Sequence, residues 1–120
     1  MSANKSNYSI GATLNFLLSG TEYFALFVTD PTKANVGQEV SGGSYARKLI
    51  PWGAVTDGKK VTTSALAFTG LPATAINYWA IYDELTAGNL LYFGLLSSAV
   101  TVPTGGTFDV GIGNLIIEET

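Results

Sequence analysis

The sequence contains no cysteine and no histidine, and few of its residues are charged. Without cysteine it can form neither disulfides nor thiolate metal sites, and without histidine the Ser-His and Cys-His nucleophile pairs are excluded. Most zinc and transition-metal sites are excluded for the same reason. We therefore expect no metal and no cofactor, and any catalysis would depend on carboxylates alone.

Positive charge is also scarce, because the six basic residues include one arginine and the formal net charge is −3. Nucleic-acid binding requires clustered lysine and arginine, so no nucleic-acid partner is expected. Charged residues make up 12% of the chain, whereas an average globular domain has about 25%. Much of the surface must then be neutral and polar or be covered by other subunits, and we expect burial against a partner.

Long apolar runs are absent too. No run approaches the roughly 18 residues of a membrane span, so no membrane partner is expected. The first eight residues contain one lysine and no apolar core, and we expect no signal peptide there. The 120 residues suit one domain. The lack of cysteine suits assembly in a reducing cytoplasm.

One helix and a series of short strands are predicted. Residues 9–20 carry leucine and isoleucine at helical spacing, with Ser9 able to cap the first turn and Gly20 able to close the last. After residue 20, apolar segments of strand length alternate with turn residues. The expected strands are residues 23–29, 45–50, 61–68, 76–82, 90–96, 100–102, 107–112 and 115–118.

This pattern predicts an all-β fold with one short N-terminal helix. About eight strands with regularly spaced turns are typical of a β-sandwich, which can be jelly-roll-like, or of a small barrel. A parallel βαβ fold would require helices between the strands. We divide the chain into an N-terminal arm, residues 1–9, and a β-sandwich domain, residues 10–120.

Two adjacent glycines break the strand pattern in residues 39–48. Gly42 and Gly43 can take positive φ at little steric cost, so a tight turn or bulge is predicted. Tyr45 and Arg47 follow, and alternation along a strand would place both side chains on one face. This arrangement is structural and indicates no reaction.

The carboxylates and glycine pairs offer no catalytic or ligand site. Asp83 and Glu84 adjoin a predicted turn and are expected to face solvent. Asp57-Gly58 lacks the Asp-x-Asp spacing of a calcium loop. Neither Gly-Gly pair precedes the Lys-Ser/Thr of a phosphate loop. We expect no catalytic residues and no enzyme.

The aromatic residues leave two alternatives open. Trp79 and Tyr92 lie within predicted strands, where aromatic side chains usually pack in a core or a subunit interface. Trp52 follows Pro51 and is the better candidate for stacking on a sugar if it is exposed in a loop. A carbohydrate-binding module that binds glycan through Trp52 is therefore an alternative function.

Four stretches resemble a family of small bacteriophage virion proteins, which are labelled tail-fibre or head-decoration components. After a short helix come YFALFVTDPT at residues 23–32 and EVSGGSYAR at residues 39–47. These are followed by IYDELTAGNLLYFGLL at residues 81–96 and VPTGGTF at residues 102–108. The resemblance spans roughly residues 10–118 and keeps the order of the family's motifs.

The resemblance implies a structural protein of the virion, with other virion proteins as partners. A compact 120-residue chain lacks the length of a fibre, so a capsid decoration (cement) protein that stabilises the shell is favoured. A tail-fibre or tail-tip adsorption protein is the alternative. The partners would be major capsid or tail proteins, and a homo-oligomer is expected. Within this resemblance, Tyr45 and Arg47 anchor the turn or an interface, and residues 1–9 become ordered on assembly.

Overall fold

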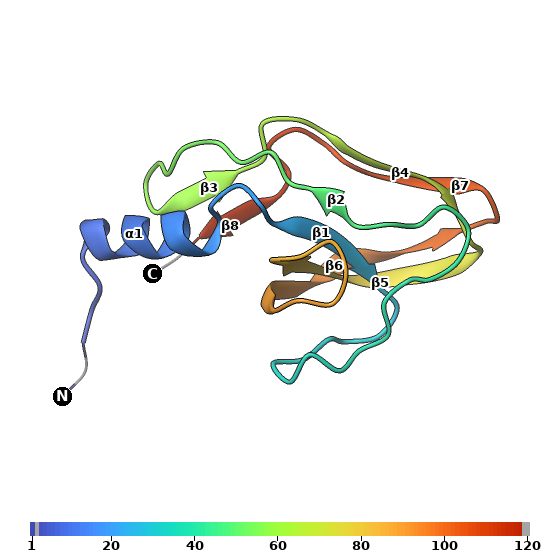
Figure 1. Cartoon of the computed structure of the whole chain (residues 1–120), viewed down its shortest axis with the longest axis horizontal. Coiled ribbons are helices and arrows are strands. Elements are labelled where there is room, and N and C mark those ends of the chain that lie inside the picture. Colours follow the sequence, from blue (N-terminus) through green and yellow to red (C-terminus); the bar gives the residue numbers. More distant parts are fainter. Residues whose placement is uncertain (2, 119–120) are drawn as a thin grey trace.

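The computed structural model describes residues 1 and 3–118, and residues 2, 119 and 120 of the predicted arm and β domain lie outside the described residues. One helix precedes eight strands in the described residues (Figure 1). The elements are α1 (Asn7–Leu17), β1 (Tyr23–Phe27), β2 (Lys48–Leu49), β3 (Lys59–Val61), β4 (Leu66–Leu71), β5 (Thr74–Tyr82), β6 (Leu90–Val102), β7 (Gly106–Val110) and β8 (Ile116–Glu118).

Helix α1 begins and ends earlier than the sequence predicts. The Ser6 hydroxyl accepts a hydrogen bond from the Ser9 N–H at 3.1 Å, so Ser6 and not Ser9 is the N-cap. Beyond the helix, the buried Glu22 carboxylate accepts the N–H groups of Gly20 and Thr21 at 2.9 and 3.2 Å. These bonds hold the chain in a non-helical turn, and the helix therefore ends at Leu17.

Three sheets form the body of the protein. The largest has the strand order β2-β1-β5-β6, and all its pairings are antiparallel. β4 pairs with β7, and β3 pairs with β8, both also antiparallel. Figure 1 shows α1 beside β3 and β8 at one end of the molecule, whose extents are 49 × 30 × 26 Å.

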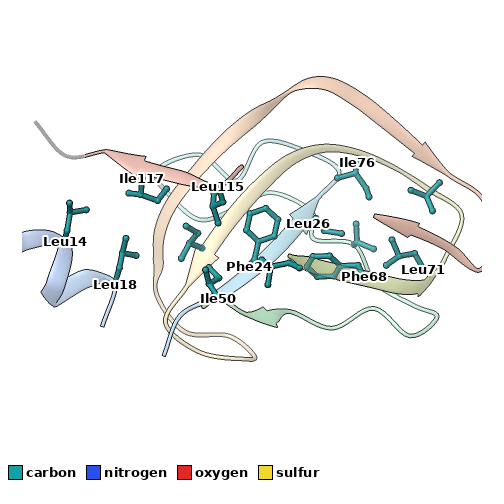
Figure 2. Packing of buried hydrophobic residues seen from close by; sticks show 14 residues of the cluster. Leu14, Leu18, Phe24, Leu26, Ile50, Phe68, Leu71, Ile76, Leu115 and Ile117 are labelled. Atoms are coloured by element: carbon teal, nitrogen blue, oxygen red, sulfur yellow. The ribbon is translucent and has the colours of Figure 1, made fainter. Parts of the chain in front are cut away.

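The main hydrophobic core lies between the four-stranded sheet and the β4–β7 pair. Phe24 of β1 and Phe68 of β4 meet there with ring centroids 6.1 Å apart. Helix α1 extends the same core, because Leu14 and Leu18 are fully buried beside Ile117 of β8 (Figure 2). One continuous core therefore holds all three sheets and the helix.

A smaller cluster occupies the opposite face of the four-stranded sheet. Successive residues of a strand point to opposite faces, so Ala25 and Phe27 lie on the face of the sheet opposite to that of Phe24 and Leu26. They pack with Ala80 and Tyr82 of β5. The rings of Phe27 and Tyr82 stack with centroids 6.2 Å apart. The sheet is thus apolar on both faces, as the near-continuous apolar sequence of β1 predicts.

The structure confirms an all-β, sandwich-like fold with one N-terminal helix. No sheet formed by the described residues closes into a barrel. Several strand boundaries were predicted wrongly. The predicted strand 45–50 is reduced to β2, residues 61–68 are divided between β3 and β4 by a bend, and residues 90–96 and 100–102 belong to one strand, β6.

Candidate functional site

The segment that follows the Val28–Gln38 loop forms a hydrogen-bonded cluster centred on one carboxylate. Glu39 accepts bonds from Arg47 Nε and Arg47 Nη2, each at 2.9 Å, and from the Tyr45 hydroxyl at 2.5 Å. The two Arg47 bonds go to different carboxylate oxygens, which is the bidentate geometry that guanidinium favours. We call Glu39, Tyr45, Arg47 and Tyr82 the Glu39 cluster.

Arg47 also holds the connection between β5 and β6. Its Nη1 donates to the carbonyl oxygens of Glu84 at 3.0 Å and Ala87 at 2.7 Å. Its guanidinium carbon lies 3.8 Å from the ring centroid of Tyr82, a cation–π contact. One side chain therefore joins Glu39, eight residues away, to residues 82–87, which are distant in the sequence. Lysine cannot reproduce this set of bonds.

Tyr45 connects the cluster to the core. Its hydroxyl donates to Glu39 and accepts the backbone N–H of Leu26 at 3.1 Å. Its ring stacks on Phe68 with centroids 6.1 Å apart. Burial, together with the hydrogen bond to Glu39, raises the pKa of Tyr45 far above its usual value. The hydroxyl is therefore protonated at physiological pH and acts as a donor.

The charges of the cluster are largely shielded from water. The side chain of Arg47 is 8% exposed and that of Glu39 is 26% exposed. Burial alone would lower the pKa of Arg47, but the hydrogen bond and charge of Glu39 outweigh it and raise that pKa. Because each charge compensates the other, removing either would leave its partner largely shielded from water without a counter-charge.

The glycine pair forms the turn that places Tyr45 and Arg47 on Glu39. Gly42 and Gly43 have φ of 103° and 55°, and the Ser44 N–H donates to the Gly70 carbonyl at 2.8 Å. Tyr45 and Arg47 precede β2, so the prediction that they alternate along a strand is wrong. Side-chain bonds to Glu39 take the place of a strand ladder at these residues.

Replacing Gly43 with alanine should destabilise the protein by about 3 kcal/mol, as judged from urea unfolding. An added Cβ would lie 2.5 Å from the Gly70 carbonyl oxygen, a backbone atom that cannot move freely. Gly105→Ala is the matched control, because it also has positive φ but nothing within 4 Å of its Cβ. It should lose only about 1 kcal/mol. Equal losses in the two variants would show that the close approach at Gly43 is unimportant.

The β5–β6 connection is closed by Asp83. Its carboxylate accepts the backbone N–H of Asn89 at 2.7 Å and the Asn89 side-chain amide at 2.9 Å. Positive φ occurs at Ala87 and Gly88 in this connection. The Gly88 Cβ position lies 2.7 Å from Asp83 Oδ1, so a side chain there would displace the carboxylate.

The contribution of Asp83 to stability should depend on pH. Hydrogen bonds from Asn89 lower the pKa of Asp83 in the folded state. A lowered folded-state pKa adds stability above the unfolded-state value of about 4, and this stability is lost as the pH falls through the folded-state pKa. Wild type should therefore exceed Asp83→Asn in unfolding free energy at pH 7, by a small amount because the group is exposed. The difference should shrink at pH 3, and an unchanged difference in urea titrations would refute the assignment.

The other aromatic candidates lie apart from the Glu39 cluster. Trp79 of β5 stacks on Phe24 with centroids 6.0 Å apart, and its indole lies across Gly94 of β6. Tyr92 of β6 is half-buried and packs against the main core. Trp52 forms a bridge with Thr62 and is also half-buried against that core, so it is not the exposed loop residue that sugar stacking would require.

Some important residues were not identified from the sequence as site residues. Glu39 was quoted only as part of a motif, although it accepts all three side-chain bonds of its cluster. Lys60 is buried and donates from Nζ to the Leu18 carbonyl at 2.6 Å, so it caps the C-terminal end of α1. The lone arginine, which needs an acidic partner when buried, was the available signal for Glu39.

The cluster has the properties of a structural support. A pocket of about 370 Å³ opens beside it, lined by the Glu39–Arg47 segment and by Leu85, Thr86 and Ala87. Glu39, Tyr45 and Arg47 bind one another, and the Tyr82 hydroxyl donates to Asn35 Oδ1. The described residues hold no group of three or more acidic, histidine or cysteine side chains suited to a metal ion. No helix within them is long and apolar enough to cross a membrane.

Comparison with known families gives a match over almost the whole chain. The family described as podophage GP4 fiber I protein gp80 matches residues 4–118. No curated protein matches the chain. The family match includes all four stretches that carry the resemblance noted in the sequence, and it confirms a phage virion family. The chain therefore belongs to the podophage GP4 fiber I protein gp80 family, which is a family of tail-fibre-type virion proteins.

Proposed function

We propose that this protein is a non-catalytic structural component of a phage tail fibre, attached to other virion proteins. The observation that carries the proposal is the family match across residues 4–118, whose description concerns a fibre protein. The mutual hydrogen bonds of Glu39, Tyr45 and Arg47 support a rigid structural role for this cluster.

The family description favours a position on the tail fibre, whereas the sequence alone favoured a position on the capsid. The decoration role was favoured because the chain is short and has few charges, but both properties also suit a compact fibre module that contacts neighbouring subunits. At 49 Å in its longest dimension, one copy could form a segment of a fibre or its attachment. We therefore propose the fibre role. The experiment described below distinguishes it from a position on the capsid.

Helix α1 offers a surface for attachment. Its eleven residues, Asn7–Leu17, include no charged side chain. Leu14 faces the core, whereas Tyr8 and Phe16 lie on the outer side with 86% and 82% of their surface exposed. Large apolar side chains exposed on a helix that lacks charges are typical of surfaces that become buried in assemblies.

Electron cryomicroscopy of the phage particle that carries this chain tests the proposal. We expect density for the chain on the tail and a copy number set by the symmetry of the tail. Density over the capsid lattice in many copies would replace the fibre role with decoration. As a second measurement, Phe16→Lys should reduce incorporation into particles, while Val36→Lys, at a residue 63% exposed in the Val28–Gln38 loop, should incorporate as wild type does.

A further inference from the structure

A pocket of about 490 Å³ lies at the β6 edge of the four-stranded sheet, between this sheet and β7. Phe24 and Leu115 are 3% and 6% exposed and therefore form its floor. Its rim carries polar side chains at exposed residues, namely Ser97, Ser98, Asp109 and Asn114. Small-molecule sites commonly combine a volume of about 300–1,000 Å³ with an apolar interior and a few polar groups. The structural role of the chain gives this pocket no task.

Aromatic rings line the pocket from both layers of the fold. Trp79 of β5 is half-buried and stacks on Phe24 with centroids 6.0 Å apart and ring planes 9° apart. Phe108 of β7, also half-buried, lines the pocket from the second layer. Gly94 lies opposite Trp79, and a Cβ at this glycine would be 2.7 Å from the indole nitrogen. Gly94 therefore lets the indole extend across the edge strand toward the pocket.

A β-bulge in β6 places two serines at the rim. Leu95 lies opposite Tyr78, and Val100 lies opposite Ile76, so residues 96–99 face Asn77 alone. Residues in a bulge leave the regular ladder, and bulges commonly redirect side chains beside functional sites. Ser97 and Ser98 occupy the middle of this bulge and line the pocket.

The polar side chains of the rim are not committed to other parts of the protein. Among the described residues, no side-chain hydrogen bond engages the two serine hydroxyls, the carboxylate or the amide. Together these groups supply both donors and acceptors. The pocket beside the Glu39 cluster differs, because Tyr45 and Arg47 there already bind Glu39. The rim of the larger pocket is thus available to a ligand.

The charge of the pocket restricts the ligand. Asp109 is the one charged side chain among the described residues that line it. An anion would be repelled by this carboxylate and would meet no lysine or arginine. A wholly apolar ligand would take water from the carboxylate without replacing its hydrogen bonds. The matching chemistry is an uncharged molecule with apolar faces and several hydroxyl groups.

We propose that this pocket binds a neutral saccharide. The apolar C–H face of a sugar ring packs against the rings of Trp79 and Phe108. Its hydroxyl groups donate to the Asp109 carboxylate and exchange hydrogen bonds with Asn114 and the two serines. Trp52, the sugar-stacking candidate from the sequence, does not line this pocket. The proposal depends on the pocket alone and not on the location of the chain in the virion.

Nuclear magnetic resonance of the isotope-labelled full chain tests the proposal. The probes are maltotriose, cellotriose, mannotriose, galactobiose and chitotriose, each added in increasing concentration. At least one should shift the indole N–H signal of Trp79 in a saturable manner, while the indole signal of Trp52 stays fixed. No shift with any of the five, or equal shifts of both indoles, would overturn the proposal.

Two further probes test the chemical class of the ligand. Trigalacturonate carries the negative charge that Asp109 should repel, and hexanol is mainly apolar. Both should bind at least tenfold more weakly than the best neutral saccharide. Equal or tighter binding of trigalacturonate would refute the charge argument, and equal or tighter binding of hexanol would make the pocket an apolar site.

Asp109→Asn tests the role of the rim. It should weaken binding of the best saccharide about tenfold, because hydrogen bonds to a charged acceptor are stronger than those to a neutral one. Asp57→Asn removes the same charge at an exposed residue outside the pocket and should bind as wild type does. Neither substitution should change the urea midpoint, since both side chains are exposed. Wild-type affinity in Asp109→Asn, or equal losses in the two variants, would contradict a site built on this rim.

Discussion

Replacing Arg47 with methionine should lower the free energy of unfolding by about 3 kcal/mol. The Arg47 side chain is 8% exposed and makes two bonds to Glu39 and two to carbonyl groups of the β5–β6 connection. Methionine retains part of the volume of arginine, but it loses the cation–π contact with Tyr82 and leaves the Glu39 carboxylate without its cation. The cost of that uncompensated charge accounts for most of the loss.

Urea unfolding followed by tryptophan fluorescence measures this effect. Arg47→Lys keeps the charge but loses the bidentate geometry, and it should lie between wild type and Arg47→Met. Lys33→Met removes one positive charge at an exposed residue of the Val28–Gln38 loop and should change stability by less than about 0.5 kcal/mol. If Arg47→Met and Lys33→Met were equally mild, the cluster would contribute nothing beyond surface charge.

A double-mutant cycle separates the ion pair from the other contacts of Arg47. Glu39→Gln removes the negative charge, so adding Arg47→Met to it no longer leaves a partly shielded carboxylate without its cation. The double variant should therefore lose less stability than the sum of the two single variants, with a difference of about 1 kcal/mol or more. Additivity would mean that Arg47 acts through its contacts with the Tyr82 ring and the carbonyl groups of Glu84 and Ala87, and not through Glu39.

The sequence predicted the parts of this site that depend on local chemistry. Adjacent glycines identified the turn at Gly42-Gly43, because positive φ is a property of single residues. The partners of Arg47 were not predictable in the same way. Glu39 is eight residues away, and the carbonyls of the β5–β6 connection are 37 and 40 residues away, so their meeting depends on the tertiary fold.

The prediction of the fold shows the same difference between local and long-range features. The fold class followed from turn spacing and apolar segments, which are short-range signals. The boundaries of β2 and β6 did not, because they depend on pairing. Residues 45–47 lack a strand neighbour, since Tyr45 and Arg47 bind Glu39. Residues 96–99 stay within β6 despite two serines, since the flanking residues pair with β5.

Trp52 illustrates why exposure is difficult to predict for a single aromatic residue. Its place after Pro51 suggested a loop on the surface, yet the bridge to Thr62 brings its ring against the main core. Its indole N–H is buried without a hydrogen-bond partner among the described residues. Trp52 thus contributes to packing at the cost of one unsatisfied donor.

Truncating Phe68 to alanine should destabilise the protein by about 4 kcal/mol, the largest loss that we expect from a single core substitution. Phe68 is 1% exposed and lies among the rings of Phe24, Tyr45 and Phe108, with centroids 6.1 to 6.4 Å away. Alanine would leave a cavity between the two layers that the surrounding strands cannot fill. Because Tyr45 rests on this ring, its hydroxyl would also lose its fixed place between Glu39 and Leu26.

Phe16→Ala is the matched control, since the same atoms are removed from a side chain that is 82% exposed on α1. It should change the unfolding free energy by less than about 0.5 kcal/mol. If Phe68→Ala is too unstable to purify, Phe68→Leu retains part of the volume and should lose about 1.5 kcal/mol. Phe68→Leu should also reduce the amide protection of Leu26 more than that of Ile117, because Leu26 donates to Tyr45. A loss spread evenly over both amides would show that Phe68 fills space without positioning Tyr45 in the Glu39 cluster.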